Sequence, residues 1–155
     1  MGVPAVTLIV EFTVLGTAAP QGSKIRTKWG AMREANPNTM PWRQEVAACA
    51  KKAMEGREPT LLPVMLVATF IFQRPKSHYR TGKRVGELRE RAPAHMSSKP
   101  DLSKLIRAAE DAMSGIVYRD DAQIVELNVT KTYGRSAHAV VSVEELTNRW
   151  SEEKP

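Results

Sequence analysis

The apolar residues of this chain follow two kinds of pattern, the first of which is typical of strands. Residues 6–15 and 64–72 are rich in β-branched and aromatic side chains and predict two strands. The second is apolar enough to lie in the middle of a sheet. Residues 123–132 and 137–143 predict two further strands, which we expect to pair as a hairpin around Gly134.

The second pattern predicts two helices. Residues 39–55 read as a helix with Thr39 as N-cap and Pro41 in the first turn, ending at Gly56. Residues 101–114 give the clearest helix, with Asp101 at its start and Gly115 after its end. Its apolar side chains recur at helical spacing and form one stripe: Leu102, Leu105, Ile106, Ala109 and Met113.

These elements occur in the order β, α, β, long loop, α, β, β. The order predicts an α+β fold in two layers, with a mixed, mostly antiparallel sheet packed against two main helices. At 155 residues the chain fits one compact domain, which we place at residues 1–147. Residues 148–155 read as a polar C-terminal tail.

Two segments between these elements are basic. Residues 17–38 carry Lys24, Arg26 and Lys28 in alternation and predict an extended loop or an irregular hairpin. Residues 74–99 carry eight Lys or Arg and two Glu, and predict a long loop with a short helix at 87–91. A connection of this length in a compact domain usually has a function of its own.

Composition narrows the class of protein. The formal net charge is +6 and the isoelectric point is about 9.7, which favours a polyanionic partner. The single cysteine, Cys49, excludes an internal disulfide, and the three histidines lack the close spacing of a zinc site. No apolar stretch is long enough to cross a bilayer, and no signal peptide is indicated, so we expect a cytoplasmic protein with no membrane partner.

Two carboxylate groups suggest a metal site. Asp101 begins a predicted helix, and Asp120 and Asp121 precede a predicted strand. Mg²⁺ needs only one or two protein carboxylates, because it keeps several of its waters. Hydrolysis of a phosphodiester needs an activated water and relief of negative charge, and divalent cations supply both. Ser103 and Arg107 share one helix face, so the guanidinium could stabilise a phosphate.

Each of these features also has an ordinary structural explanation. Asp101 can serve only as an N-cap, which local sequence favours, and an Asp-Asp pair before a strand is usually a solvated turn. Lys104, Arg107 and Asp111 fit the wet face of an amphipathic helix. From the residues alone, both sets of explanations stay open.

The two carboxylate segments together resemble the RusA family of Holliday junction resolvases. The family pattern joins K-P-D-x-D-[NK]-L-x-[KR]-A-x-x-D-A-[LM]-x-G to D-D-x-Q-[IV]. Residues 12–24 and 74–82 also resemble segments of the family, so the similarity spans nearly the whole chain. The matching residues are Lys99, Pro100, Asp101, Leu105, Arg107, Ala108, Asp111, Ala112, Gly115, Asp120, Asp121, Gln123 and Ile124.

This resemblance implies a homodimer that binds four-way DNA junctions and nicks two opposed strands symmetrically with Mg²⁺, for which Mn²⁺ substitutes. It implies that Asp101 and Asp121, with Asp120 beside them, hold the metal, and that Arg107 is the catalytic basic residue. We expect the DNA-facing surface to comprise Lys24, Arg26, Lys28, Arg74, Lys76, Arg80, Lys83, Arg84 and Lys104.

One position departs from the family pattern. Ser103 stands where the family has a second aspartate, and a neutral hydroxyl is a weaker ligand for a hard cation than a carboxylate. The alternative expectation is therefore a junction-binding protein of the same fold with impaired catalysis. A purely architectural or RNA-binding module is a third interpretation, and it predicts no preference for four-way junctions over linear duplex.

Overall fold

A four-stranded sheet forms the body of the protein. The computed structural model describes residues 5–147, so the predicted tail at 148–155 lies outside the described residues. The strands lie side by side in the order β1 (Ala5–Leu15), β6 (His138–Thr147), β4 (Val64–Gln73) and β5 (Ile124–Gly134). The β1–β6 and β6–β4 pairs are antiparallel, whereas β4 and β5 are parallel.

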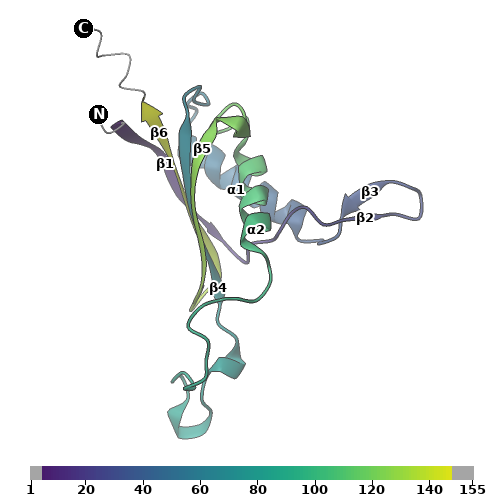
Figure 1. Cartoon of the computed structure of the whole chain (residues 1–155), viewed down its shortest axis with the longest axis vertical. Coiled ribbons are helices and arrows are strands. Elements are labelled where there is room, and N and C mark those ends of the chain that lie inside the picture. Colours follow the sequence, from purple (N-terminus) through teal and green to yellow (C-terminus); the bar gives the residue numbers. More distant parts are fainter. Residues whose placement is uncertain (1–4, 148–155) are drawn as a thin grey trace.

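Both helices, α1 (Thr39–Met54) and α2 (Leu102–Met113), cover the same face of this sheet (Figure 1). The α+β class, the two layers and the mostly antiparallel mixed sheet are therefore confirmed. The helices lie there because alternate strand residues are apolar on that face. No helix within residues 5–147 combines the length and hydropathy that crossing a bilayer requires.

The core lies between the sheet and the helices. Leu66 and Phe70 of β4 are fully buried against Val46 of α1 and Leu105 of α2 in one apolar cluster. In α2 the predicted stripe is confirmed, because Leu105, Ile106, Ala109 and Met113 are all buried and Leu102 packs at the edge of the core. This packing fixes which residues of α2 point outward, toward solvent.

The predicted hairpin of the last two strands is wrong. β4 lies between β5 and β6, and the link at residues 135–137 passes the end of β4, where Gln73 pairs with Gly134. β4 takes the central position because it is apolar on both faces, with Met65, Val67 and Ile71 on the face away from the helices. β5 has polar side chains on that same face, among them Glu126, Asn128 and Thr130, which suits an edge strand.

The start of α1 also differs from the prediction. Asn38 occupies the N-cap position without a side-chain capping bond, and Thr39 is the first residue of the helix. The buried Thr39 hydroxyl donates a hydrogen bond to the carbonyl oxygen of Pro20, at 2.7 Å. Thr39 therefore ties α1 to the segment after β1, rather than capping the helix.

Two basic arms project from the body (Figure 1). The first is a hairpin of β2 (Lys24–Arg26) and β3 (Met32–Glu34), as the sequence predicts for residues 17–38. The second is the loop at residues 74–99, whose regular turns are η1 (Lys76–His78) and η2 (Gly82–Arg84). The short helix expected at 87–91 is absent from it, because Leu88 forms a bridge with Tyr79 and Arg89 N–H donates to the His78 carbonyl at 2.9 Å.

Candidate metal centre and DNA-facing surface

Asp101 lies at the N-terminal end of α2, between the points where the two arms leave the body (Figure 1). It occupies the N-cap position, but its side chain makes no capping hydrogen bond. Its carboxylate is 3.7 Å from Lys104 Nζ and is about half exposed. Asp101 therefore takes the N-cap position without side-chain capping, and its carboxylate is accessible to solvent.

The backbone just before Asp101 is held by β5. Lys131 Nζ donates to the carbonyl oxygens of Ser98 and Pro100, at 2.6 and 2.8 Å. These bonds fix the end of the long loop against the sheet, directly before Asp101. Sequence reasoning missed Lys131, because a lysine in a strand of alternating polarity gives no local signal of this contact.

A cleft of about 890 Å³ lies next to Asp101. Its walls come from the segment after β1 at residues 15–20, from the start of α1 and from Lys99 to Asp101 and Lys104 at the start of α2. Two lysines, Lys99 and Lys104, and two carboxylates, Glu45 and Asp101, line it, so its charged lining is balanced.

Asp120 and Asp121 lie in the turn before β5, near the C-terminal end of α2. Asp120 caps the short helix η3 (Asp121–Gln123): its Oδ1 accepts from Ala122 N–H at 2.8 Å, and its own N–H donates to Gln123 Oε1 at 2.8 Å. Gln123 in turn donates to the carbonyl oxygens of Thr60 and Leu62, which anchors the turn. The Asp120–Asp121 pair is thus a structured turn with a rigid backbone.

Four carboxylates gather at this end of α2, and we call Glu110, Asp111, Asp120 and Asp121 the acidic cluster. The pKa of Asp121 is raised by a hydrogen bond with the Asp120 side chain, by partial desolvation, and by the charges of Asp120 and Asp111. A hydrogen bond from Ala122 N–H acts in the opposite direction and lowers this pKa. Burial, with the charges of Asp121 and Asp111, raises the pKa of Glu110. Carboxylates that repel one another in this way form a setting that a cation relieves.

Asp111 is tied to the segment that leads into the hairpin arm. Gln21 Nε2 donates a hydrogen bond to Asp111 Oδ2, and Gln21 N–H donates to the Lys104 carbonyl at 3.0 Å. Asp111 is partly exposed on the outer face of α2, where Gln21 covers part of it. Sequence reasoning missed Gln21, because 90 residues separate it from Asp111.

Tyr118 supports the acidic cluster from inside the protein. It is fully buried, and its hydroxyl donates to the Glu110 carbonyl at 2.7 Å. Burial, together with the charges of Glu110, Asp121 and Asp111, raises the pKa of Tyr118. Tyr118 therefore stays a neutral donor that locks the turn after α2 onto the end of the helix.

Arg107 lies along the outer face of α2, between these two ends. A Cβ built on Gly22 would be 3.4 Å from Arg107 Nη1, so the guanidinium lies beside the hairpin arm. Its positive charge partly offsets the raised pKa of Glu110. Ser103 is exposed one turn earlier on the same helix face, as the sequence predicts.

Asp101 and Asp121 do not meet within one chain. Asp101 precedes α2, whereas Asp121 interacts with Asp111, which is about 15 Å further along the helix axis at 1.5 Å per residue. Within residues 5–147, no three His, Cys, Asp or Glu side chains are close enough to hold one metal ion together. Each end of α2 alone still offers the one or two carboxylates that Mg²⁺ requires, so the donor chemistry fits a divalent cation.

The raised pKa of Glu110 leads to a prediction on stability. A carboxyl whose pKa is raised by folding stabilises the fold below its ordinary value of 4.5 and loses that contribution as pH rises through the raised pKa. Charged Glu110 is therefore unfavourable at neutral pH. Glu110→Gln should raise the free energy of unfolding at pH 7, by no more than about 1 kcal/mol after solvent screening.

Urea unfolding at several pH values measures this effect, and the gain should vanish near pH 4, where both states are protonated. Glu58→Gln, which removes an exposed carboxylate outside the acidic cluster, is the matched control and should show no gain. A loss of stability in Glu110→Gln at pH 7 would mean that Glu110 is favourably paired instead.

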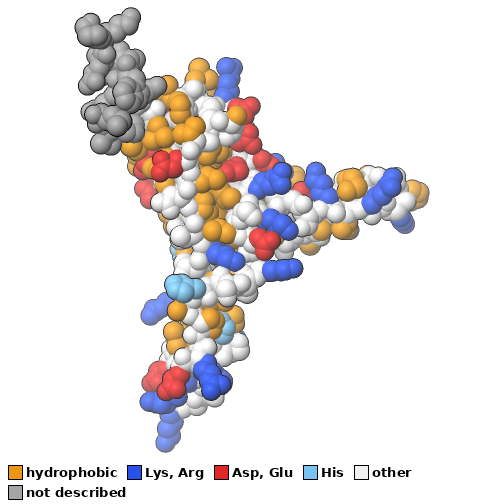
Figure 2. Space-filling model, viewed as in Figure 1, with side chains coloured by type: hydrophobic (Ala, Val, Ile, Leu, Met, Phe, Trp, Pro, Cys, Tyr) orange, Lys and Arg blue, Asp and Glu red, His pale blue; other side chains and the backbone are white. Residues whose placement is uncertain are grey.

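The predicted DNA-facing residues occur mainly on the two arms (Figure 2). Lys24, Arg26 and Lys28 are exposed on the hairpin arm, and Lys76, Lys83 and Arg84 are exposed on the loop arm. Lys104 lies between the arms, where its Nζ donates to Ser23 Oγ at 3.2 Å. The predicted DNA-facing cations therefore lie on the two arms and, with Lys104, at the start of α2.

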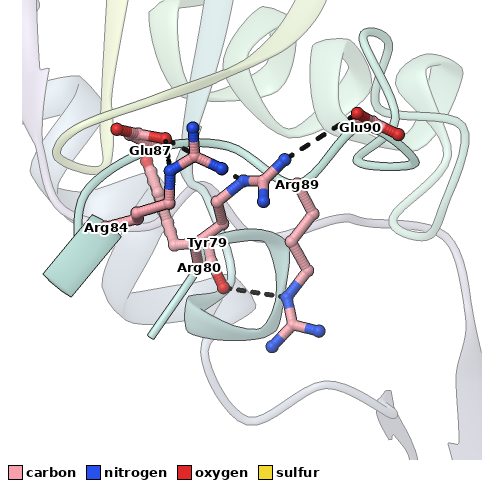
Figure 3. Close-up of polar contacts among 6 residues, drawn as sticks. All are labelled: Tyr79, Arg80, Arg84, Glu87, Arg89 and Glu90. Atoms are coloured by element: carbon pink, nitrogen blue, oxygen red, sulfur yellow. Dashed lines mark hydrogen bonds and ion pairs between the residues drawn. The ribbon is translucent and has the colours of Figure 1, made fainter. Parts of the chain in front are cut away.

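Several arginines of the loop arm also hold the loop together (Figure 3). Arg84 lies 3.3 Å from Glu87, and Arg80 lies 3.9 Å from Glu87 and 4.0 Å from Glu90. Arg89 Nε donates to the Tyr79 carbonyl at 2.9 Å. These exposed pairs are weak, so they leave the arginines able to exchange partners with a phosphate.

Arg74 has a mainly structural role. Its guanidinium stacks over the Tyr133 ring at 4.5 Å and donates to the Pro93 carbonyl at 2.7 Å. His78 meets the edge of the same ring, at 5.4 Å between centroids. Arg74 thus attaches the loop arm to β5, which fixes where the arm leaves the body.

Comparison with known proteins finds a matching family model and a relative. The family model described as endodeoxyribonuclease RusA matches residues 16–144. An uncharacterized protein of Bacillus subtilis strain 168, YqaN, is 28% identical over 143 residues, which cover 89% of this chain and 97% of YqaN. The match includes both arms, α2 and the turn with Asp120 and Asp121.

Proposed function

This chain belongs to the RusA endodeoxyribonuclease family, and we propose that it is a divalent-metal-dependent nuclease that resolves four-way DNA junctions by paired symmetric nicks. The family as a whole comprises nucleases that act on branched DNA. The observation that supports the finer proposal is the position of Asp101 at the start of α2, where its half-exposed carboxylate makes no capping bond. Phosphates held by the arms are brought toward that carboxylate.

We infer that Asp101, Asp121 and Asp120 hold Mg²⁺, with Mn²⁺ as a substitute. The cation would supply an activated water and would neutralise charge on the scissile phosphate. The raised pKa of Asp121 supports its role, because a crowded carboxylate gains from a nearby cation. Asp120 is partly committed to its capping bonds, so it contributes mainly by fixing the backbone of the turn.

The remaining residues act on the DNA. Arg107 is exposed on α2 and would donate to a phosphate oxygen, where its charge offsets the negative charge that develops during hydrolysis. Lys104, which lies beside Asp101, would hold a neighbouring phosphate. The exposed cations of the two arms would position the duplexes on either side of the site.

We further propose that Asp101 of one protomer and Asp121 of a second protomer form each site together. The two residues lie at opposite ends of α2, so one chain cannot present both to one metal ion. A two-fold dimer with antiparallel α2 helices would bring unlike ends together twice. Two such sites would also account for two symmetric nicks.

The second candidate function is junction binding with little or no catalysis, and Ser103 is the residue that favours it. Its hydroxyl offers no negative charge to a metal ion at the N-terminal end of α2. Under this alternative the chain binds four-way junctions but shows no saturable Mg²⁺ site in isothermal titration calorimetry. Under the leading proposal, Mg²⁺ binding saturates and its heat disappears in Asp121→Asn.

The test of the proposed function is cleavage of a four-way junction labelled on each strand, beside a linear duplex of the same sequence. With Mg²⁺ or Mn²⁺, we expect paired nicks at symmetric positions of the junction and none in the duplex. Equal cleavage of both substrates would reject the junction specificity. Binding of the junction without cleavage in either metal would favour the second candidate.

A further inference from the structure

The hairpin arm ends in an exposed tryptophan. Trp29 lies in the turn between β2 and β3 and is 85% exposed, next to Gly30, whose φ of +84° tightens the turn. Thr27 N–H donates to the Ala31 carbonyl at 2.8 Å and closes the turn. A large aromatic ring is therefore held in solvent at the end of the arm that is farthest from the body (Figure 1).

Positive charge surrounds this ring. Lys28 Nζ lies 5.1 Å from the centre of the ring, and Lys24, Arg26 and Arg33 follow along the two strands. Glu34, the one carboxylate within the paired strands, lies at the base of the arm, where it accepts from Gly22 N–H at 3.4 Å. Basic side chains extend along the arm to its end (Figure 2), so the arm attracts phosphates next to the exposed ring.

We propose that Trp29 stacks on bases at the branch point of the DNA and so gives the chain its preference for branched over linear DNA. Every base has a face on which an aromatic ring can stack, but in a continuous duplex neighbouring base pairs cover both faces. A base face becomes available where the stack is interrupted, as at a branch point. This inference rests on the proposed function only in taking branched DNA as the substrate.

A second copy of the chain is the other occupant that Trp29 could have. Ile25 and Met32 are also exposed on the arm, at 41% and 60%, and such side chains can form a protein interface. The four cations of the arm disfavour contact with the same arm of a second copy and favour a polyanion. The observations therefore favour DNA, and the experiment distinguishes the two occupants.

The experiment measures binding without divalent cations, so that no cleavage occurs. The probe is a four-way junction with 2-aminopurine at the branch point, and the reference is a linear duplex of the same sequence. Trp29→Ala should weaken junction binding by about 5- to 150-fold, as expected for the loss of one stacked base, and duplex binding by less than about three-fold. It should also abolish the change in 2-aminopurine fluorescence, whereas Trp29→Phe should keep most of both.

Met32→Ala is the matched control, because it removes another exposed apolar side chain from the same arm, and it should bind both DNAs as the native chain does. The proposal is overturned if Trp29→Ala binds the junction normally or weakens binding to both DNAs equally. It is also overturned if sedimentation shows that Trp29→Ala dissociates a dimer, because the ring then contacts a second copy.

The outcome is separable from that of the proposed function. A fluorescence change that depends on Trp29, in a chain that cleaves no DNA, would support the stacking role and reject the nuclease. If the native chain resolves junctions and Trp29→Ala keeps the native preference for junctions over duplex, the nuclease is supported and the stacking role is rejected. Asp121→Asn keeps the ring and should give the native fluorescence change.

Discussion

Replacing Asp121 with Asn should abolish cleavage of four-way junctions and leave junction binding within about three-fold of the native value. The reason is that the substitution removes a negative metal ligand but none of the cations that contact phosphates. Asn has nearly the same size as Asp, and Asp121 is exposed, so the fold should be preserved. Cleavage is measured on labelled junctions with Mg²⁺, and binding by gel shift without it.

Glu126→Gln is the matched control for this variant, because it removes an exposed carboxylate from β5, five residues further along the chain. It should cleave at the native rate. Asp101→Asn should behave as Asp121→Asn does. Native turnover by either aspartate variant would remove that residue from the metal site.

Replacing Ser103 with Asp should increase cleavage and lower the Mg²⁺ concentration required for half-maximal rate by at least about 10-fold. The substitution adds a carboxylate on the exposed face of α2, two residues after Asp101. A carboxylate binds a hard cation more strongly than a hydroxyl does, so metal occupancy should rise at a given concentration. The rate is measured across a Mg²⁺ titration on the labelled junction.

Ser103→Asn separates charge from size, because it adds a similar side chain with no negative charge. It should leave the Mg²⁺ dependence close to that of the native chain. If Ser103→Asp and Ser103→Asn respond alike, the added charge has no role at the metal. If Ser103→Asp cleaves and the native chain does not, the native chain is the binding protein of the second candidate function.

The local elements were predictable because their signals are local. The apolar stripe of α2 repeats every three or four residues, which fixes both the helix and its buried face. The two basic segments were predictable as long connections from their lack of apolar periodicity, although Ala18, Ala19 and Met96 within them join the core. Their projection from the body as two arms required the structure, because it depends on anchors such as Arg74 on Tyr133.

The order of the strands was not predictable from these patterns. A short link at Gly134 suggested a hairpin, but β4 is apolar on both faces and takes the place between β5 and β6. Which strand becomes central depends on which one buries most apolar surface there, and this requires comparing segments that are distant in the sequence. Spacing along the chain carries no such information.

The candidate site was predictable in its residues but not in its arrangement. The motif brought out Asp101, Arg107 and Asp121, but it could not show that the chain after α2 turns back at Tyr118. That turn keeps Asp121 at the C-terminal end of the helix, far from Asp101. The bond from Gln21 to Asp111 was equally hidden, because the two residues meet only in the folded chain.

The most direct test of the account is to mix Asp101→Asn and Asp121→Asn chains under conditions that allow protomers to exchange. If each site combines the two ends of α2 from two protomers, a mixed dimer contains one intact site and one doubly altered site. The equimolar mixture should then regain about a quarter of the native sites and nick single strands of the junction, although each variant alone is inactive. An inactive mixture in which mixed dimers form and bind junctions would contradict the shared site.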